Sequence, residues 1–287
     1  MTATVPRHGA PGPDDEGYAR KVAQRTIEEI ESLERAPHMI DALWNSVRIC
    51  VQARSTVDPR GSGIDTWEAV VNTMQVGSAV FRAAGTIEGS VECRIHHEMR
   101  RLPATGPKNF TSAPEWIDAF WYAIICRDQK RMTELCEVHQ DAFRASGAEY
   151  DEYLYHWAAA LQAYWLRQQS RLIEELTAAF RGSHSDSAEI APRDWLQKIS
   201  YPPINLFYQF VKHDHEGFNA ALVEALNFHK AYWTADEDRE NDIEGLWAIG
   251  PLAMACLAYD GGFPIGVESD YLPVQLLNRS WLGEFPT

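Results

Sequence analysis

Histidine and carboxylate side chains that could bind a metal ion occur close together at two places in the sequence. Glu92 and His96 stand four residues apart, and so do Glu152 and His156. On a helix this spacing places both side chains of a pair on one face, and two such helices facing each other could hold two metal ions. Neither pair has the Glu-x-x-His spacing of di-iron bundles, so we prefer a hydrogen bond or salt bridge as the interpretation of each.

The run 97–101, which reads His-Glu-Met-Arg-Arg, begins like the zinc-binding helix of a metalloprotease. That helix needs a second histidine at its fifth position, where this chain has the cation of Arg101. The sequence also lacks the glycine-rich loops that bind phosphate and the G-x-S-x-G turn of serine hydrolases. We therefore predict no catalytic, cofactor-binding or metal-binding residues. The alternative is a helical metal-dependent enzyme that uses Glu92, His96, His97 and Glu98, with or without Glu152 and His156.

A strongly acidic segment, 236–244, is a candidate site for a protein partner. It holds six carboxylates and one cation, and it follows an aromatic pair. Carboxylates beside aromatic side chains can attract and hold a basic partner; alternatively, the segment is a solvated loop whose last carboxylates complement the dipole of the next helix. The predicted partner-binding residues are Tyr232, Trp233, Asp236, Glu237, Asp238, Glu240, Asp242 and Glu244.

Aromatic residues crowd the predicted helix 150–168 and cover more than one of its faces. Packing in the core can absorb one face. The other aromatic side chains must meet a neighbouring hairpin, a partner or a small apolar ligand, so a small-ligand-binding protein is a further alternative function. The aromatic residues are Tyr150, Tyr153, Tyr155, Trp157, Tyr164 and Trp165.

The elements that position these residues are predicted to be helices throughout. After residue 14, apolar residues recur every three or four positions, and capping-box motifs begin helices at Asp65 (with Glu68) and at Ser112 (with Glu115). With no alternating strand pattern in view, we predict an all-α fold of about a dozen helices. The predicted helices span 14–35, 38–56, 65–84, 88–101, 113–127, 129–146, 150–168, 170–181, 192–200, 203–212, 215–233, 242–259 and 273–281.

Two segments, 120–128 and 207–214, resemble each other. Each is an aromatic helix followed by an aspartate, Asp128 or Asp214, that can cap a second amphipathic helix. This is the unit of stacked antiparallel α-hairpins, so we predict a tetratricopeptide-like array. Connections are short and no long flexible linker divides the chain. We therefore predict a flexible N-terminal tail over 1–13 and a single all-helical domain over 14–287.

Composition and charge narrow the classes of function. Of the 287 residues, 45% are hydrophobic and 23% are charged, which excludes wholesale disorder. The net charge of −15 repels phosphate, so we predict no binding to nucleic acid and, for any protein partner, a basic one. The five cysteines have no C-x-x-C spacing and fall in apolar patterns, as reduced, buried thiols do. Without an apolar signal segment or a run long enough to span a bilayer, the sequence predicts a cytoplasmic protein with no membrane partner.

Several long segments in the second half of the chain are recognisable together. They are 147–153, 201–208, 227–233, 255–265 and the run Glu268, Ser269, Asp270, Tyr271, Leu272 and Pro273. These segments resemble the immunity protein 49 family, in particular its actinobacterial branch, and the resemblance covers most of the chain beyond about residue 40. It implies an all-helical protein of a bacterial polymorphic toxin system. Such proteins are expected to bind and neutralise a toxin encoded beside them, which protects the producing cell and its siblings.

The family signature also has an explanation in terms of structure. Gly261 and Gly262 supply the left-handed backbone that ends a helix. Any of residues 268–270 can cap the helix predicted to begin near residue 273. Tyr271 and Leu272 can hold this turn against the preceding hairpin. On this interpretation the signature stabilises the fold, and the resemblance brings no catalytic residues with it.

Overall fold

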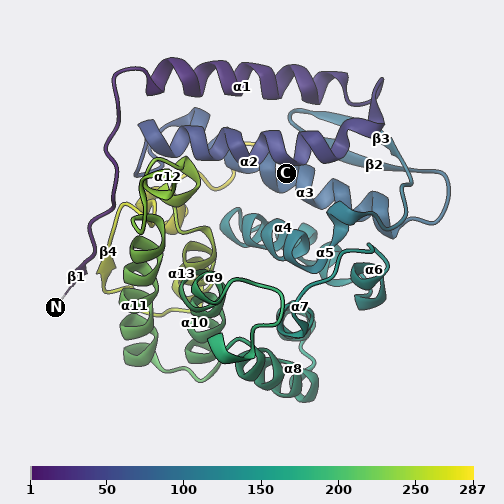
Figure 1. Cartoon of the computed structure of the whole chain (residues 1–287). Helices are drawn as coiled ribbons and strands as arrows, with labels where there is room; N and C mark the ends of the chain where they lie inside the picture. The colour runs from purple at the N-terminus through teal and green to yellow at the C-terminus, as the bar shows by residue number, and fades with distance from the viewer. Residues whose placement is uncertain (1) are drawn as a thin grey trace. The chain divides into compact units, whose positions relative to one another are not determined.

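The computed structural model describes residues 2–287, apart from the side chain of Ser185, and the fold is all-α (Figure 1). Among the described residues, the strands form two short pairs. The chain divides into two compact units: unit 1 comprises residues 2–10 and Tyr150–Ser280, and unit 2 comprises Pro11–Glu149 and Trp281–Thr287. The organisation of residues 14–287 as one domain stays a prediction.

Unit 2 is built from helices that pack in the order of the sequence. Its helices are α1 (Asp15–Ser32), α2 (Ile40–Val57), α3 (Ile64–Gly85), α4 (Ala113–Ile125), α5 (Gln129–Cys136) and α6 (Gln140–Arg144), with 3-10 turns at Pro37–Met39 and Asn109–Thr111. Helix α2 packs between α1 and α3, and α4 and α5 pack on α3. The close approach of α2 to α3 depends on Gly77, because a Cβ atom there would lie 2.8 Å from the buried ring of Trp44.

A β-hairpin occupies the place of the helix predicted over 88–101, and that prediction is wrong. Strand β2 (Ser90–Ile95) pairs antiparallel with strand β3 (Glu98–Pro103), and the pair begins at Ile95 opposite Glu98. Side chains along β2 are buried at every second position, which is the period of a strand with one face on the core. The apolar spacing of three or four residues along the chain suggested a helix here, but Val91, Cys93 and Ile95 alternate with polar residues, as a strand requires.

Unit 1 contains the remaining helices. They are α7 (Glu152–Trp165), α8 (Gln169–Gly182), α9 (Arg193–Trp195), a π-helical turn (Leu196–Ser200), α10 (Tyr201–Val211), α11 (His215–Trp233), α12 (Glu237–Glu240), α13 (Ile249–Asp260) and α14 (Val274–Leu277), with 3-10 turns at Ser185–Ser187 and Ile243–Leu246. Helix α7 packs on α8, and α10 packs on α11 and α13. The fully buried side chains of Phe207 and Phe218 lie at the centre of this packing.

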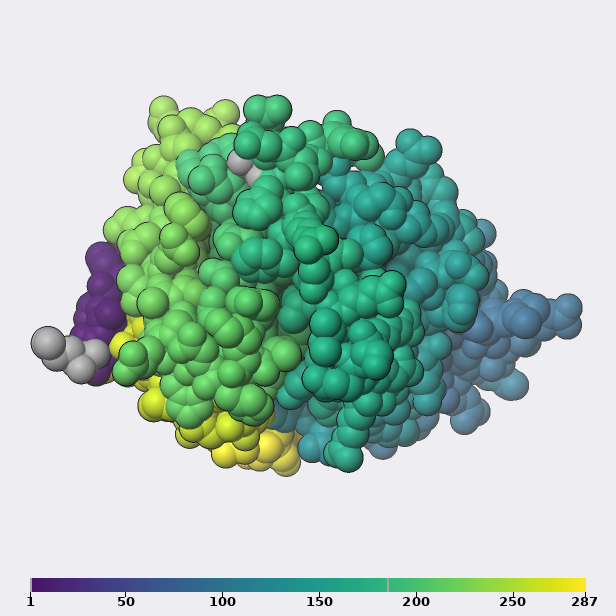
Figure 2. Space-filling view, turned by 90° about the horizontal axis from the view of Figure 1, so that it is seen from below, coloured from purple at the N-terminus to yellow at the C-terminus, as the bar shows by residue number. Residues whose placement is uncertain are grey.

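The first residues of the chain lie against the C-terminal part of unit 1. Strand β1 (Ala3–Thr4) pairs in parallel with strand β4 (Val267–Glu268), and the Lys230 ammonium donates to the carbonyl of Pro6. In Figure 2 the purple N-terminal residues accordingly touch the yellow and light-green segments. The tail predicted over 1–13 therefore includes a strand, while its flexibility stays a prediction; residue 1 lies outside the described residues.

Three α-hairpins share one turn geometry. Helices α4, α7 and α10 are followed by Arg127, Arg167 and His213, whose φ angles are 55°, 59° and 56°. In each turn, the backbone N–H of the residue that follows this left-handed residue donates to the carbonyl of the residue five positions before the donor, at 2.8–3.1 Å. This is the hydrogen bond of a Schellman motif. Asp128 and Asp214 then cap α5 and α11, as predicted. The tetratricopeptide-like stacking of such hairpins stays a prediction.

Two further expectations concern the chain as a whole. Within residues 2–287 the five cysteines are free and buried, which confirms the predicted buried thiols. Burial raises the pKa of the Cys50 thiol to about 11. Of the helices described, none combines the length and the apolar composition needed to cross a membrane.

Candidate functional site

The acidic segment 236–244 forms two short helical turns after α11. Asp236 accepts the N–H of Arg239, and Asp242 accepts the N–H of Glu244, both at 2.9 Å. Asp236 thereby caps α12, and Asp242 caps the 3-10 turn Ile243–Leu246. Two of the six carboxylates are thus used to begin helical turns, which is a common role of aspartate.

The single cation of this segment, Arg239, is held within unit 1. Its guanidinium donates to Asp194 at 3.0 Å, pairs with Asp236 at 3.2 Å and lies over the ring of Tyr232 at 4.2 Å. The other carboxylates of the segment are exposed to solvent, and we call them the acidic surface: Glu237, Asp238, Glu240 and Glu244.

The two aromatic residues before this segment have different surroundings. Tyr232 is half-buried between Arg239 and the ring of Trp195, whose centroid is 5.3 Å away. Trp233 is 6% exposed and lies under Gly245, where a Cβ atom would come within 2.5 Å of the indole. Trp233 therefore belongs to the core. A role of the other predicted residues in binding a partner stays a prediction.

Tyr271 of the family signature joins three parts of unit 1. Its side chain is fully buried, and its hydroxyl accepts the N–H of His8 at 3.1 Å and lies 2.6 Å from His8 Nδ1. Its carbonyl accepts the N–H of Ala248 at 3.0 Å, and its ring packs edge-on against His229 of α11. The residue thus connects the N-terminal segment, the start of α13 and α11, in agreement with a structural role for the signature.

The helix cap predicted for residues 268–270 is not formed. Helix α14 follows Pro273 and has no side-chain cap, while the Ser269 hydroxyl accepts the N–H of Tyr271 at 3.1 Å. The physical reason is that β4 and a tight turn occupy these residues and bury Tyr271 and Leu272. The predicted glycine stop is present, since Gly262 ends α13 with a φ of +82°.

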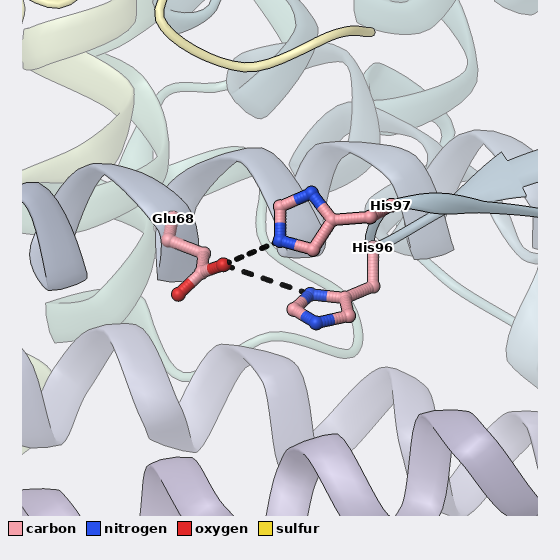
Figure 3. Close-up of side chains that lie close together, drawn as sticks. All are labelled: Glu68, His96 and His97. Carbon is pink, nitrogen blue, oxygen red and sulfur yellow. Dashed lines mark hydrogen bonds and ion pairs between the residues drawn. The ribbon is translucent and has the colours of Figure 1, made fainter.

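In the structure, His96 and His97 lie beside the carboxylate of Glu68, which the sequence predicts to be part of a capping box. Glu68 lies on α3, and its Oε1 is 2.9 Å from His97 Nε2 and 3.7 Å from His96 Nδ1 (Figure 3). The two imidazole rings pack together with centroids 4.0 Å apart. Helix α3 begins at Ile64 without a side-chain cap. The predicted capping box is therefore not formed, and Glu68 does not serve as its second residue. We call these three residues the Glu-His-His cluster.

The two histidines of the cluster form the turn of the β2–β3 hairpin. His96 has a φ of +57°, a left-handed conformation that two-residue hairpin turns require and that glycine or asparagine usually supplies. Its Nδ1 lies 3.4 Å from the Asn72 amide. Burial and the charge of His97 lower the pKa of His96, so its imidazole is held neutral more readily than a free one.

An open cavity of about 380 Å³ adjoins the cluster inside unit 2. It lies among α1, α2 and α3, and both Glu68 and Asn72 line it. Arg54 and Asp65 also line it, so its wall carries charges of both signs. Glu68 is the cluster residue that lines this cavity, and His97 is exposed to solvent, so the Glu-His-His cluster is not sealed in the core.

The other residues considered for a metal-dependent enzyme lie apart from the Glu-His-His cluster. Glu92 lies on the exposed side of β2, in register with Arg101, and so does not share a helix face with His96. Glu98 pairs with Arg100 at 3.2 Å. In unit 1, His156 Nδ1 lies 2.7 Å from a carboxylate oxygen of Glu175.

The aromatic helix α7 contributes several side chains to the core of unit 1. Tyr153, Tyr155 and Trp157 are each at most 6% exposed, and Tyr164 packs edge-on against Phe207 and Phe210. These side chains meet neighbouring helices, which was one of the outcomes left open by the sequence.

Comparison with protein families decides the identity of the chain. The family model of immunity protein 49 matches residues 58–276. The chain belongs to the immunity protein 49 family. This match confirms the resemblance seen in the sequence, and it spans the Glu-His-His cluster, the acidic surface and the signature, whereas α1 and α2 precede it. Neither a curated protein nor a solved structure matches the chain.

The acidic surface and the Glu-His-His cluster differ in what they could bind. The acidic surface is a set of exposed charges on capped turns and suits contact with another protein. The Glu-His-His cluster offers converging nitrogen and oxygen atoms and suits an ion.

Proposed function

We propose that this protein neutralises a toxin encoded beside it by binding that toxin stoichiometrically in the cytoplasm of the producing cell. Membership of the immunity protein 49 family, over residues 58–276, is the observation that carries the proposal. Neutralisation by binding requires a stable surface that is complementary to the toxin. It does not require catalytic residues on the immunity protein.

The acidic surface is the part of unit 1 that we propose contacts the toxin. Exposed carboxylates on a chain of net charge −15 attract a basic partner and raise its rate of association. The contacts of Arg239 with Asp194, Asp236 and Tyr232 fix α12 in place before a partner arrives. A surface that is already ordered loses less conformational entropy on binding.

The partner that this surface fits is a basic toxin, such as a nuclease. An enzyme that acts on a phosphate polymer presents positive charge around its active site. An acidic protein that covers this site competes with the polymer for the same charges. The chain itself is proposed to bind neither nucleic acid nor membrane.

A charge-reversal pair tests the surface. We expect Glu237→Lys with Asp238→Lys to slow association with the toxin by about tenfold at low salt, because like charges then meet across the interface. The caps Asp236 and Asp242 are left intact, so that the fold is retained. Surface plasmon resonance measures the rate, and growth of cells that express the toxin measures protection.

The matched control places the same charge change elsewhere in unit 1. Glu174→Lys with Glu224→Lys alters two exposed carboxylates on α8 and α11. We expect association within about twofold of wild type for this pair. If both pairs slowed association equally, the effect would come from net charge alone. If the Glu237→Lys, Asp238→Lys pair did not slow association, the acidic surface would not be part of the interface.

A further inference from the structure

We infer that Glu68, His96 and His97 form a binding site for a first-row divalent transition metal ion, with Zn²⁺ as the probe that represents the class. The site lies entirely within unit 2, where α3 supplies the carboxylate and the turn of the β2–β3 hairpin supplies both imidazoles. It is independent of the proposed binding of a toxin.

The separations of the ligand atoms suit one ion. Zinc bonds of about 2.0–2.2 Å in a tetrahedral arrangement place neighbouring ligand atoms about 3.3 Å apart. Glu68 Oε1 lies 2.9 Å from His97 Nε2 and 3.7 Å from His96 Nδ1, on either side of that value. One ligand atom from each of the three residues lies within 4.8 Å of the others. An ion therefore needs only small side-chain rotations to be held by all three.

The donor set selects the class of ion. Imidazole nitrogens bind zinc, nickel, copper and cobalt well, whereas Ca²⁺ and Mg²⁺ prefer oxygen ligands throughout. Two imidazoles and one carboxylate make a set of three protein ligands, which leaves a coordination position for water. His97 is exposed to solvent and Glu68 lines the adjoining cavity, so water can reach this position.

The backbone of the hairpin turn holds the two imidazoles in place. A two-residue turn fixes the direction of consecutive side chains, and His96 takes up a left-handed conformation that glycine or asparagine adopts more readily. Asn72 Nδ2 lies 3.4 Å from His96 Nδ1, the nitrogen that faces Glu68, so this long contact would give way to the bond with the ion.

A bound ion would tie the hairpin to α3. The hairpin joins α3 to the segment before α4 and packs on α3 through the buried side of β2. A coordination bond at its tip adds a cross-link at the end where the turn is exposed, so the ion should stabilise unit 2.

Calorimetric titration of untagged, chelator-treated protein with Zn²⁺ at about pH 7 tests the site. We expect binding of a single equivalent and no heat with Mg²⁺ or Ca²⁺. The variants Glu68→Gln, His97→Gln and His96→Asn each remove one ligand, and asparagine is chosen because it tolerates the positive φ. Each should weaken binding by about 100-fold or more, since loss of even an outer partner of a ligand costs 10–100-fold.

A matched variant, His38→Asn, removes an exposed histidine of unit 2 outside the cluster and should bind Zn²⁺ like wild type. Thermal unfolding gives a second readout: Zn²⁺ should raise the midpoint of wild type and His38→Asn, but not the midpoint of the three ligand variants. Absence of Zn²⁺ binding by wild type, or equal binding by wild type and the ligand variants, would overturn the assignment.

Discussion

His229 has its protonation state fixed by its surroundings in unit 1. Its ring is buried against Trp233 and Tyr271, and its Nε2 lies 2.8 Å from the carbonyl of Gly245. Because a carbonyl only accepts, Nε2 carries the proton and donates it. Burial lowers the pKa of His229 to about 4, and the charge of His8 adds to the effect.

The free energy of unfolding should therefore fall as the pH is lowered from about 6.5 to about 4. In this window the unfolded chain binds a proton at His229 and the folded chain does not, so acid favours unfolding. A pKa difference of this size corresponds to about 3 kcal/mol. Denaturant unfolding at a series of pH values measures it.

The variant His229→Gln isolates this contribution. Glutamine retains an N–H that can donate to Gly245 but does not titrate. The pKa of His8 is also lowered by burial, yet His8 is present in both proteins, so the difference between their curves belongs to His229. Parallel pH dependences of wild type and variant would contradict the assignment.

Asp151 organises the loop that follows α8. Its carboxylate accepts the backbone N–H groups of residues 189–191 at 2.8, 3.0 and 2.8 Å. Burial raises the pKa of Asp151, but the three hydrogen bonds outweigh burial and the net pKa is lowered. The residue lies in the segment 147–153, which resembles the family, but its partners are 38 to 40 residues away, so the sequence could not reveal this role.

We expect Asp151→Asn to lower the free energy of unfolding by about 2–3 kcal/mol. The amide brings an N–H₂ group to a site filled with N–H donors, and it removes the charge that strengthens the hydrogen bonds. Glu189→Gln, in the same loop and exposed, should change stability by less than about 0.5 kcal/mol. Denaturant titration compares the variants, and equal effects would show that only loop charge matters.

At the scale of elements, most helices were predicted from the sequence and the hairpin was not. Apolar residues at helical spacing and the caps at Asp128 and Asp214 identify the hairpins of both units. At 90–103 the strands are only six residues long, and their turn has two histidines in place of Asn-Gly. The Glu-His-His cluster was missed for the same reason, since Glu68 meets the histidines only when 88–101 is a hairpin.

The turn after α7 offers a test of the shared hairpin geometry. Arg167 has a φ of +59°, which costs a residue with a Cβ atom about 1–2 kcal/mol and costs glycine almost nothing. We expect Arg167→Gly to raise the free energy of unfolding by about 0.5–1 kcal/mol, after allowance for the freer unfolded chain. Chemical denaturation provides the measurement.

Arg167→Ala is the control for this turn. Alanine removes the same side chain and charge but retains the Cβ atom, so it should not stabilise the protein. If alanine and glycine had the same effect, the side chain and not the backbone conformation would govern the stability of the turn.

At the scale of the whole molecule, charge is the property that the sequence predicts best. A net charge of −15 and the acidic segment 236–244 follow from composition, and the structure adds which carboxylates are used as caps. The burial of Trp233 could not be predicted, because it depends on Gly245 folding back over the indole.

Long-range attraction between this acidic chain and a basic toxin should depend on salt. We expect the association rate to fall as ionic strength rises from about 0.01 M to about 0.15 M, while the dissociation rate changes little. Stopped-flow mixing measures both rates, and an association rate independent of salt would contradict electrostatic steering.

The most direct test of the proposed function mixes purified immunity protein with the purified toxin encoded beside it. The account predicts a one-to-one complex on size exclusion chromatography and a toxin activity that falls linearly until the two proteins are equal in amount. Full toxin activity with separate elution of the two proteins would contradict it, and so would complete inhibition by a small fraction of an equivalent.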